Sequence, residues 1–293
     1  MAHEPLSAGS PRSTGSRIPS VPFGFLPREH ASARFAEALS RYPVVLLVAP
    51  NGYGKTAFLA HELASFPDPV AWLTIDDRVL TPTTFFRALK RSLEQAVPTL
   101  ETATGGRSES SPETGRPDID AYLRLVDRIA ETAPRICIVM DGYERIESDD
   151  IDSGIDALMA YLPAGAHLVI VSSTRPHLSI NRMELSGRLL EMKTADLSFD
   201  AEEAAALYND TLDLSLPLEA VERINDRMDG WVAGLRMAEV ALQSGTSVES
   251  VLAAGSESQR GISAYLIDDI VDRQSDDVRT FLFESSMFDA FCA

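Results

Sequence analysis

Two spacings of apolar residues alternate along the chain, and each predicts a different kind of element. Short continuous apolar runs are typical of strands buried in a parallel sheet, and apolar residues that recur every three or four positions are typical of helices. In order, the pattern predicts strand Val44 to Val48, a helix to Phe66, strand Val70 to Ile75, helix Pro82 to Val97, helix Ile119 to Thr132, strand Ile136 to Met140, helix Ile155 to Leu162 and strand His167 to Ser172. This order predicts an α/β fold in which helices cover both faces of a parallel sheet.

The pattern changes after Leu197, where no further strand run follows. Asp200 and Glu203 resemble a capping box, which marks the start of a helix. The apolar spacing then predicts helices over Pro217 to Met228, Trp231 to Leu242, Ser263 to Asp272 and Asp277 to Ser285. We therefore expect an all-helical part, with the boundary near Ala195.

The residues after the first strand form a phosphate-binding pattern. They read APNGYGKT from Ala49 to Thr56 and match GxxxxGK[ST], with Ala49 in place of the first glycine. In such a loop backbone amides surround phosphate oxygens, the lysine reaches the β and γ phosphates, and the hydroxyl ligates Mg²⁺. The following helix N-terminus also favours an anion. We expect nucleotide binding by Asn51, Gly52, Tyr53, Gly54, Lys55 and Thr56.

A second metal ligand is expected at the end of the strand Ile136 to Met140. Asp141 follows this run, where a carboxylate can hold the Mg²⁺ that bridges nucleotide phosphates; a turn-forming Asp beside Gly142 is the alternative. Hydrolysis also needs a group that positions or deprotonates water. Gly142 cannot provide it, so Glu144 is the nearest candidate catalytic base. A solvated turn carboxylate paired with Arg145 is the alternative for Glu144.

A cationic residue follows the strand His167 to Ser172. Arg175 stands three residues after this strand, where a guanidinium can sense the γ-phosphate or stabilise transferred charge. A surface arginine before Pro176 is the alternative.

Composition limits the classes of partner. A chain of 293 residues with 45% hydrophobic content can bury a sizeable core in about two units. The net charge of -18 repels nucleic-acid phosphates and anionic lipid, so we expect no direct nucleic-acid contact by this chain. No apolar segment reaches the roughly 20 residues of a membrane span, so we expect a cytoplasmic protein without membrane contact. Residues 1–20 and 101–117 are rich in small and polar residues and predict disorder.

The chain resembles the N-terminal ATPase module of the large ATP-binding LuxR-type transcription regulators, relatives of the maltose-regulon activator within the signal-transduction ATPases with numerous domains. The matching segments are VAPNGYGKT at 48–56, AWLTIDD at 71–77, IVMDGYERI at 138–146, LLEMKTADLSFDAEEAAALYN at 189–209 and GWVAGLRMA at 230–238, with Pro27 and Arg28 before the first helix. The resemblance implies a P-loop nucleotide-binding domain over 21–195 with a flexible insert at 101–117, a helical lid over 196–245, and the beginning of a winged-helix-like domain over 255–293.

The resemblance also implies a function. We expect an ATP/ADP-dependent switch that uses Mg²⁺, in which nucleotide state controls self-association of the full-length protein and, through distal domains absent from this chain, transcription. Three positions depart from the family: Gly142 replaces a second Asp, Ser173 replaces an arginine, and Glu184 replaces a basic residue. These changes weaken hydrolysis more than binding, so weak ATPase activity at most is expected, with Arg175 as the candidate replacement for the arginine.

Two other functions remain open from the sequence. A degenerate scaffold that binds nucleotide without hydrolysing it would fit Gly142 and Ser173. A P-loop kinase acting on a small molecule would need an acceptor pocket and an arginine-rich lid, and the acidic segment Ala201 to Asp229 gives no strong sign of either.

Overall fold

The computed structural model describes residues 17–22, 24–102, 118–211 and 214–252. Most of the expected disordered tail, nearly all of the 101–117 insert, the winged-helix-like segment and the two helices expected after residue 260 lie outside the described residues.

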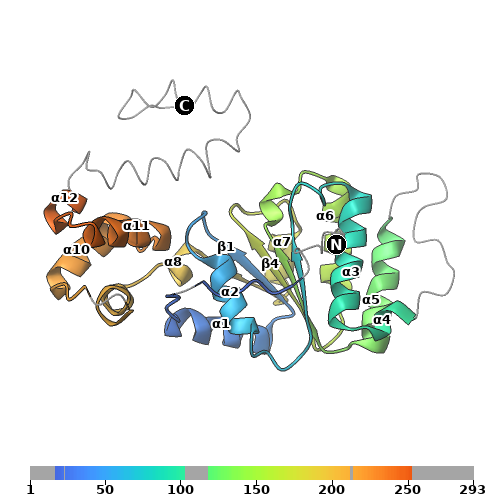
Figure 1. The fold of residues 1–293 in the computed structure, drawn as a ribbon. Coiled ribbons are helices and arrows are strands. Elements are labelled where there is room, and N and C mark those ends of the chain that lie inside the picture. Colours follow the sequence, from blue (N-terminus) through green and yellow to red (C-terminus); the bar gives the residue numbers. More distant parts are fainter. Residues whose placement is uncertain (1–16, 23, 103–117, 212–213, 253–293) are drawn as a thin grey trace, which may run out of the picture. The chain divides into compact units, whose positions relative to one another are not determined.

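A parallel sheet forms the centre of the first part of the chain (Figure 1). Its strands are β1 (Val44–Val48), β2 (Val70–Thr74), β3 (Ile136–Asp141), β4 (Ala166–Ser172) and β5 (Leu189–Met192). All four strand pairings are parallel, and the strand order is β2-β3-β4-β1-β5. The expected α/β fold with a parallel sheet is confirmed.

Helices cover both faces of this sheet, as Figure 1 shows with α3, α5 and α6 on one side and α1 and α2 on the other. The helices up to residue 197 are α1 (Glu29–Arg41), α2 (Lys55–Leu63), α3 (Pro82–Ala96), α4 (Thr99–Thr102), α5 (Ile119–Thr132), α6 (Asp149–Tyr161), α7 (Ile180–Leu185) and α8 (Thr194–Leu197), with the short turn η2 (Tyr143–Arg145). Those that follow are α9 (Ala201–Ala205), the π-helical η3 (Ala206–Thr211), α10 (Leu218–Met228), α11 (Val232–Gln243) and α12 (Val248–Leu252).

Alternate strand residues build the core on the α3, α5 and α6 face. Leu46 of β1, Ile138 of β3 and Leu168 of β4 belong to one buried cluster with Phe85 of α3 and Ile155 of α6. Each side chain is at most 1% exposed, and burying one such side chain stabilises the fold by about 1.5–3 kcal/mol. This cluster holds the strands in register, and so fixes where their carboxyl ends lie.

Helix boundaries follow local capping. Thr81 caps α3 by accepting a hydrogen bond from the Thr84 amide, with Pro82 at the first helical position. Asp200 and Glu203 form the expected capping box of α9. The largest difference from the predicted boundaries is in α6, which begins at Asp149 and not at Ile155. The first turn of α6 is acidic, and its negative charges complement the helix dipole. Because this turn has few apolar residues, it does not show the apolar spacing that predicts a helix.

The strand β5 was not predicted. Its residues Leu189–Met192 pair with β1 at the edge of the sheet, so only part of the strand is buried. A run of four residues containing Glu191 is too short and too polar to give a strand signal. The sequence analysis therefore missed this strand, whereas its prediction of no strand after Leu197 concerned the residues that follow β5.

The described chain divides into two compact units. The first comprises the residues up to Pro50 and those from Lys55 to Leu197, and the second comprises Asn51–Gly54 with the residues from Ser198 onward. The four loop residues of the phosphate-binding pattern thus group with the helical segment. Within the described residues, no helix combines the length and apolarity that a membrane crossing needs.

The arginine that precedes α1 is buried in the first unit. Arg28 is 2% exposed, its Nη1 donates to the carbonyl of Leu197 at 2.7 Å, and its guanidinium lies 5.2 Å from the Phe58 ring centroid. Arg34 of α1 also pairs with Asp196 at 2.7 Å. These two contacts fix α8, the last helix of the first unit, against α1.

Candidate functional site

The residue in place of the first glycine of the pattern leaves the sheet in a fully buried position. Ala49 is 0% exposed, and its amide donates to the Ser172 carbonyl of β4 at 3.3 Å. A larger side chain at this position would have to displace close-packed neighbours. The structure therefore gives a steric reason for alanine here, which carries the same backbone amide as glycine.

The loop Asn51–Gly54 contacts the helical segment of the second unit. The indole Nε1 of Trp231 donates to the Asn51 carbonyl at 2.9 Å, and the Ala233 amide donates to the Gly52 carbonyl at 3.0 Å. Gly52 has φ of 86°, a left-handed conformation that favours glycine. Left-handed glycines in such loops turn successive amides toward an anion.

The lysine of the pattern is buried at the start of α2. Lys55 is 9% exposed, and its Nζ donates to the carbonyls of Ala49 at 2.7 Å and Pro50 at 3.1 Å. Burial lowers the pKa of Lys55, and the nearby carboxylates of Glu144 and Asp141 oppose that shift. The ammonium therefore lies within the electrostatic range of both acidic candidates.

The two expected metal ligands meet. The Thr56 hydroxyl of α2 donates to the Asp141 carboxylate at the end of β3, with Oγ1 at 3.1 Å from Oδ1 and 3.0 Å from Oδ2. β4 lies between β1 and β3, so residues far apart in sequence reach the same edge of the sheet.

The Asp141 carboxyl is 7% exposed, and its pKa is raised from 3.8 to about 6. Burial is the main cause and the Glu144 charge adds to it, whereas the Thr56 hydrogen bond and the Lys55 charge act in the opposite direction. A buried carboxylate with a raised pKa is one whose charge a cation would stabilise.

The turn after β3 directs Glu144 to the same region. Gly142 has φ of 92° and its amide donates to the Val171 carbonyl at 3.1 Å. A Cβ at this position would lie 3.2 Å from the Ile75 carbonyl oxygen, so the turn favours glycine. The turn η2 then places Glu144 so that its Oε2 accepts from the Ser173 amide at 3.0 Å.

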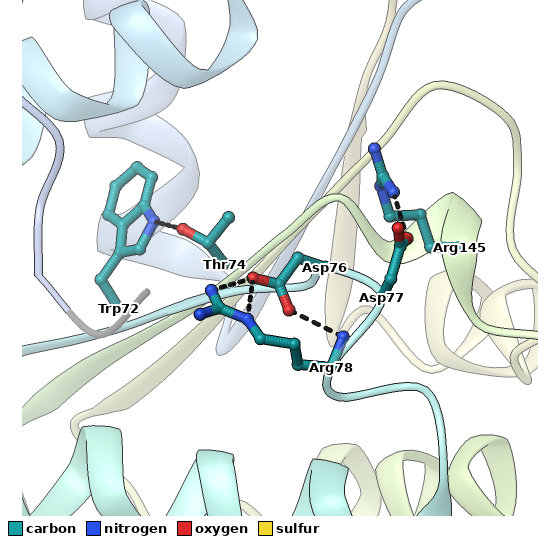
Figure 2. Close-up of polar contacts among 6 residues, drawn as sticks. All are labelled: Trp72, Thr74, Asp76, Asp77, Arg78 and Arg145. Atoms are coloured by element: carbon teal, nitrogen blue, oxygen red, sulfur yellow. Dashed lines mark hydrogen bonds and ion pairs between the residues drawn. The ribbon is translucent and has the colours of Figure 1, made fainter. Parts of the chain in front are cut away.

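The neighbouring arginine has another partner. Arg145 donates to Asp77 at 3.0 Å, as Figure 2 shows, and not to Glu144 as one sequence interpretation suggested. Asp76, also after β2, accepts from the amide and guanidinium of Arg78. The two aspartates after β2 thus accept hydrogen bonds from arginines, whereas Glu144 accepts one from a backbone amide.

Arg175 lies in an acidic environment after β4. Its Nη2 is 3.1 Å from Glu184 Oε2 of α7 and 3.3 Å from Glu191 Oε2 of β5. The side chain is 45% exposed. A role in phosphate sensing requires that an anion displace these two carboxylates.

Among the described residues, no three His, Cys, Asp or Glu side chains gather as a metal site. Magnesium at nucleotide sites takes one or two protein ligands and completes its shell with phosphate oxygens and water. The Thr56 hydroxyl and the Asp141 carboxylate fit that donor set, because both are oxygens and the carboxylate lacks a full counter-charge.

No protein-family model matches the chain. Among curated proteins, it is 32% identical over 282 residues to the serine/threonine-protein kinase PknK of Mycobacterium tuberculosis, covering 94% of this chain and 25% of that protein. It is 27% identical over 260 residues to the HTH-type transcriptional regulator MalT of Yersinia enterocolitica, covering 85% of this chain and 28% of that protein. The chain thus spans about a quarter of the length of these relatives.

Solved structures share the fold. A Walker-type ATPase of Pyrococcus abyssi matches 90% of the chain and 77% of its own, with a TM-score of 0.57 and 14% identity. A signal-transduction ATPase with numerous domains, carrying a tetratricopeptide repeat sensor, from Pyrococcus horikoshii matches 94% of the chain and 36% of its own, with a TM-score of 0.52 and 15% identity. Together with the MalT similarity, these matches confirm the resemblance expected from the sequence.

Proposed function

We propose that this chain is the nucleotide-binding switch module of a larger regulatory protein. Asn51 to Thr56 hold ATP or ADP, and Thr56 and Asp141 hold Mg²⁺. The observation that carries the proposal is the contact between the Thr56 hydroxyl and the Asp141 carboxylate at 3.0–3.1 Å, within the electrostatic range of Lys55. The similarity to the regulator MalT and the fold shared with signal-transduction ATPases support it.

Each residue has a defined part in this proposal. The Lys55 ammonium leaves the Ala49 and Pro50 carbonyls for phosphate oxygens, which are stronger acceptors for a cation. ATP supplies the γ-phosphate that distinguishes it from ADP, together with the bond that can be hydrolysed. Glu144, held by the Ser173 amide, orients or deprotonates water, and Arg175 responds to the γ-phosphate once Glu184 and Glu191 release it.

The switch needs a difference in affinity between two conformations. Moving a population from mostly one state to mostly the other requires about 5 kcal/mol of preference, which one γ-phosphate with its Mg²⁺ can supply through charged contacts. In the whole protein this change controls self-association and, through other domains, transcription. The module acts in the cytoplasm and does not itself contact DNA.

Titration calorimetry with MgADP and MgATP tests the binding step. We expect saturable one-site binding by the purified chain and none by Lys55→Ala, with Lys90→Ala on α3, outside the phosphate-binding pattern, as the control. A folded chain that takes up neither nucleotide at millimolar concentration rejects the proposal. Sedimentation velocity with ADP and then ATP tests whether the bound nucleotide changes the oligomeric state.

Two observations favour a scaffold that binds without hydrolysis. Gly142 cannot act as a second acid, and Arg175 is engaged by two carboxylates. Steady phosphate release from ATP supports the hydrolysing switch, whereas retained MgATP binding without release supports the scaffold. Consumption of ATP that depends on an added small-molecule acceptor would instead support a kinase.

A further inference from the structure

Two carbonyls of the loop Asn51–Gly54 are occupied by donors from the helical segment of the same unit. Trp231 Nε1 holds the Asn51 carbonyl at 2.9 Å, and the Ala233 amide holds the Gly52 carbonyl at 3.0 Å. The indole also fills the space beside Gly52, because a Cβ there would lie 2.3 Å from Nε1 and 2.8 Å from Cε2. Side chain and loop therefore fit closely, and only glycine at position 52 permits the contact.

The geometry of the peptide bond links these carbonyls to the amides of the loop. A trans peptide group is planar, so its N–H points opposite to its carbonyl. With the Asn51 carbonyl directed at Trp231, the Gly52 N–H is directed to the other side of the loop. The Gly52 carbonyl, directed at Ala233, likewise turns the Tyr53 N–H away from the helix.

This orientation matters because a phosphate attracts amides and repels carbonyl oxygens. Glycine accepts either sign of φ, so the peptide groups on both sides of Gly52 can rotate easily. A rotated group would present a carbonyl oxygen where the anion needs a donor. A hydrogen bond that holds the carbonyl in place therefore prepares the loop for an anion before it binds.

We propose that Trp231 is a positioning residue for nucleotide binding, whose indole N–H holds the Asn51 carbonyl and so presents the Gly52 amide to a phosphate. The inference rests on the proposed function, since it assigns a role within the same nucleotide site. Trp231 touches the loop and not the ligand, and it acts through the direction of one peptide group.

The test compares two tryptophan substitutions, Trp231→Phe and Trp72→Phe, in calorimetric titrations with MgADP. Trp72 is the matched control, because its indole also donates one hydrogen bond, to Thr74 Oγ1 at 3.2 Å within the sheet (Figure 2). Loss of one such bond corresponds to about a five- to tenfold weaker affinity. We expect that loss for Trp231→Phe and a change of at most about twofold for Trp72→Phe. Equal affinities of the two variants would overturn the inference.

Fluorescence gives a second measurement that does not need a folded Trp231 variant. The chain has two tryptophans, so the Trp72→Phe protein reports on Trp231 alone. We expect its emission to change saturably with MgADP, at the affinity found by calorimetry. Unchanged emission at saturation would also overturn the inference. If the wild-type chain binds no MgADP, the proposed function fails, and the role of Trp231 fails with it. If the wild-type chain binds MgADP but the tryptophan tests give the contrary results, only the role of Trp231 fails.

Discussion

Replacing Asp141 by Asn should stabilise the nucleotide-free protein at neutral and alkaline pH. The wild-type carboxylate is 7% exposed at the end of β3, and Thr56 is its one side-chain hydrogen-bond donor among the described residues. Without Mg²⁺, folding must bury this negative charge with incomplete compensation. Asn has nearly the same shape, can still accept from Thr56, and carries no charge.

The magnitude follows from the pKa of Asp141, which folding raises from 3.8 to about 6. Between these values the folded state binds more protons than the unfolded state, so the free energy of unfolding falls as pH rises. The cost is absent below pH 3.8 and complete above about pH 6. The difference between the two pKa values corresponds to about 3 kcal/mol, which is an upper bound for the increase in the free energy of unfolding on replacing Asp141 by Asn.

Urea unfolding in EDTA at pH 8, 7, 6 and 5 measures this effect. The advantage of Asp141→Asn should be nearly the same at pH 8 and pH 7 and should shrink from pH 6 to pH 5, while Asp127→Asn, at an exposed position on α5, changes stability by no more than about 0.5 kcal/mol. Saturating MgADP should reverse the order, because a ligand stabilises only the state that binds it. An Asp141→Asn protein that is no more stable than wild type at pH 8, or whose gain is independent of pH, would refute the reasoning.

Three further outcomes test individual residues. Lys55→Ala should abolish detectable MgADP binding in calorimetry, and binding equal to that of Lys90→Ala would reassign the site. Gly142→Asp should lower the free energy of unfolding by about 1–2 kcal/mol in urea titrations, because φ is 92° there and the Ile75 carbonyl is close; unchanged stability would show that the turn relaxes. If the chain hydrolyses ATP, Glu144→Gln should slow phosphate release by about 100-fold or more at unchanged MgADP affinity, and wild-type turnover in this variant would exclude Glu144 as the base.

Local patterns in the sequence predicted four strands of the sheet to within one residue at each end, and one helix at both ends. The helix Ile119 to Thr132 matches α5 at both ends, because its apolar stripe is regular and Asp118 caps it. The strand ending at Asp141 was also visible, since continuous apolar runs are typical of interior parallel strands. These features depend on neighbouring residues alone.

Contacts between distant residues were not predictable in the same way. Arg145 pairs with Asp77, 68 positions earlier, and Trp231 bonds to Asn51 across 180 positions. The partners of Arg175 include Glu191 of β5, a strand whose short run gives no signal. The arginine pairings follow from how the strands are ordered, and the Trp231 bond follows from how the helical segment packs on the loop. A single sequence specifies neither arrangement.

The strand order also affects how the chain folds during synthesis. Val44 of β1 pairs with Leu168 of β4, which lies 168 − 44 = 124 positions later, and with Leu189 of β5, later still. At about 5–20 residues per second, the ribosome needs about 6–25 s to make the first partner after β1 has been made. During that interval the apolar segment Val44–Val48 has no strand neighbour, so it is a natural binding segment for chaperones that recognise short hydrophobic stretches of nascent protein.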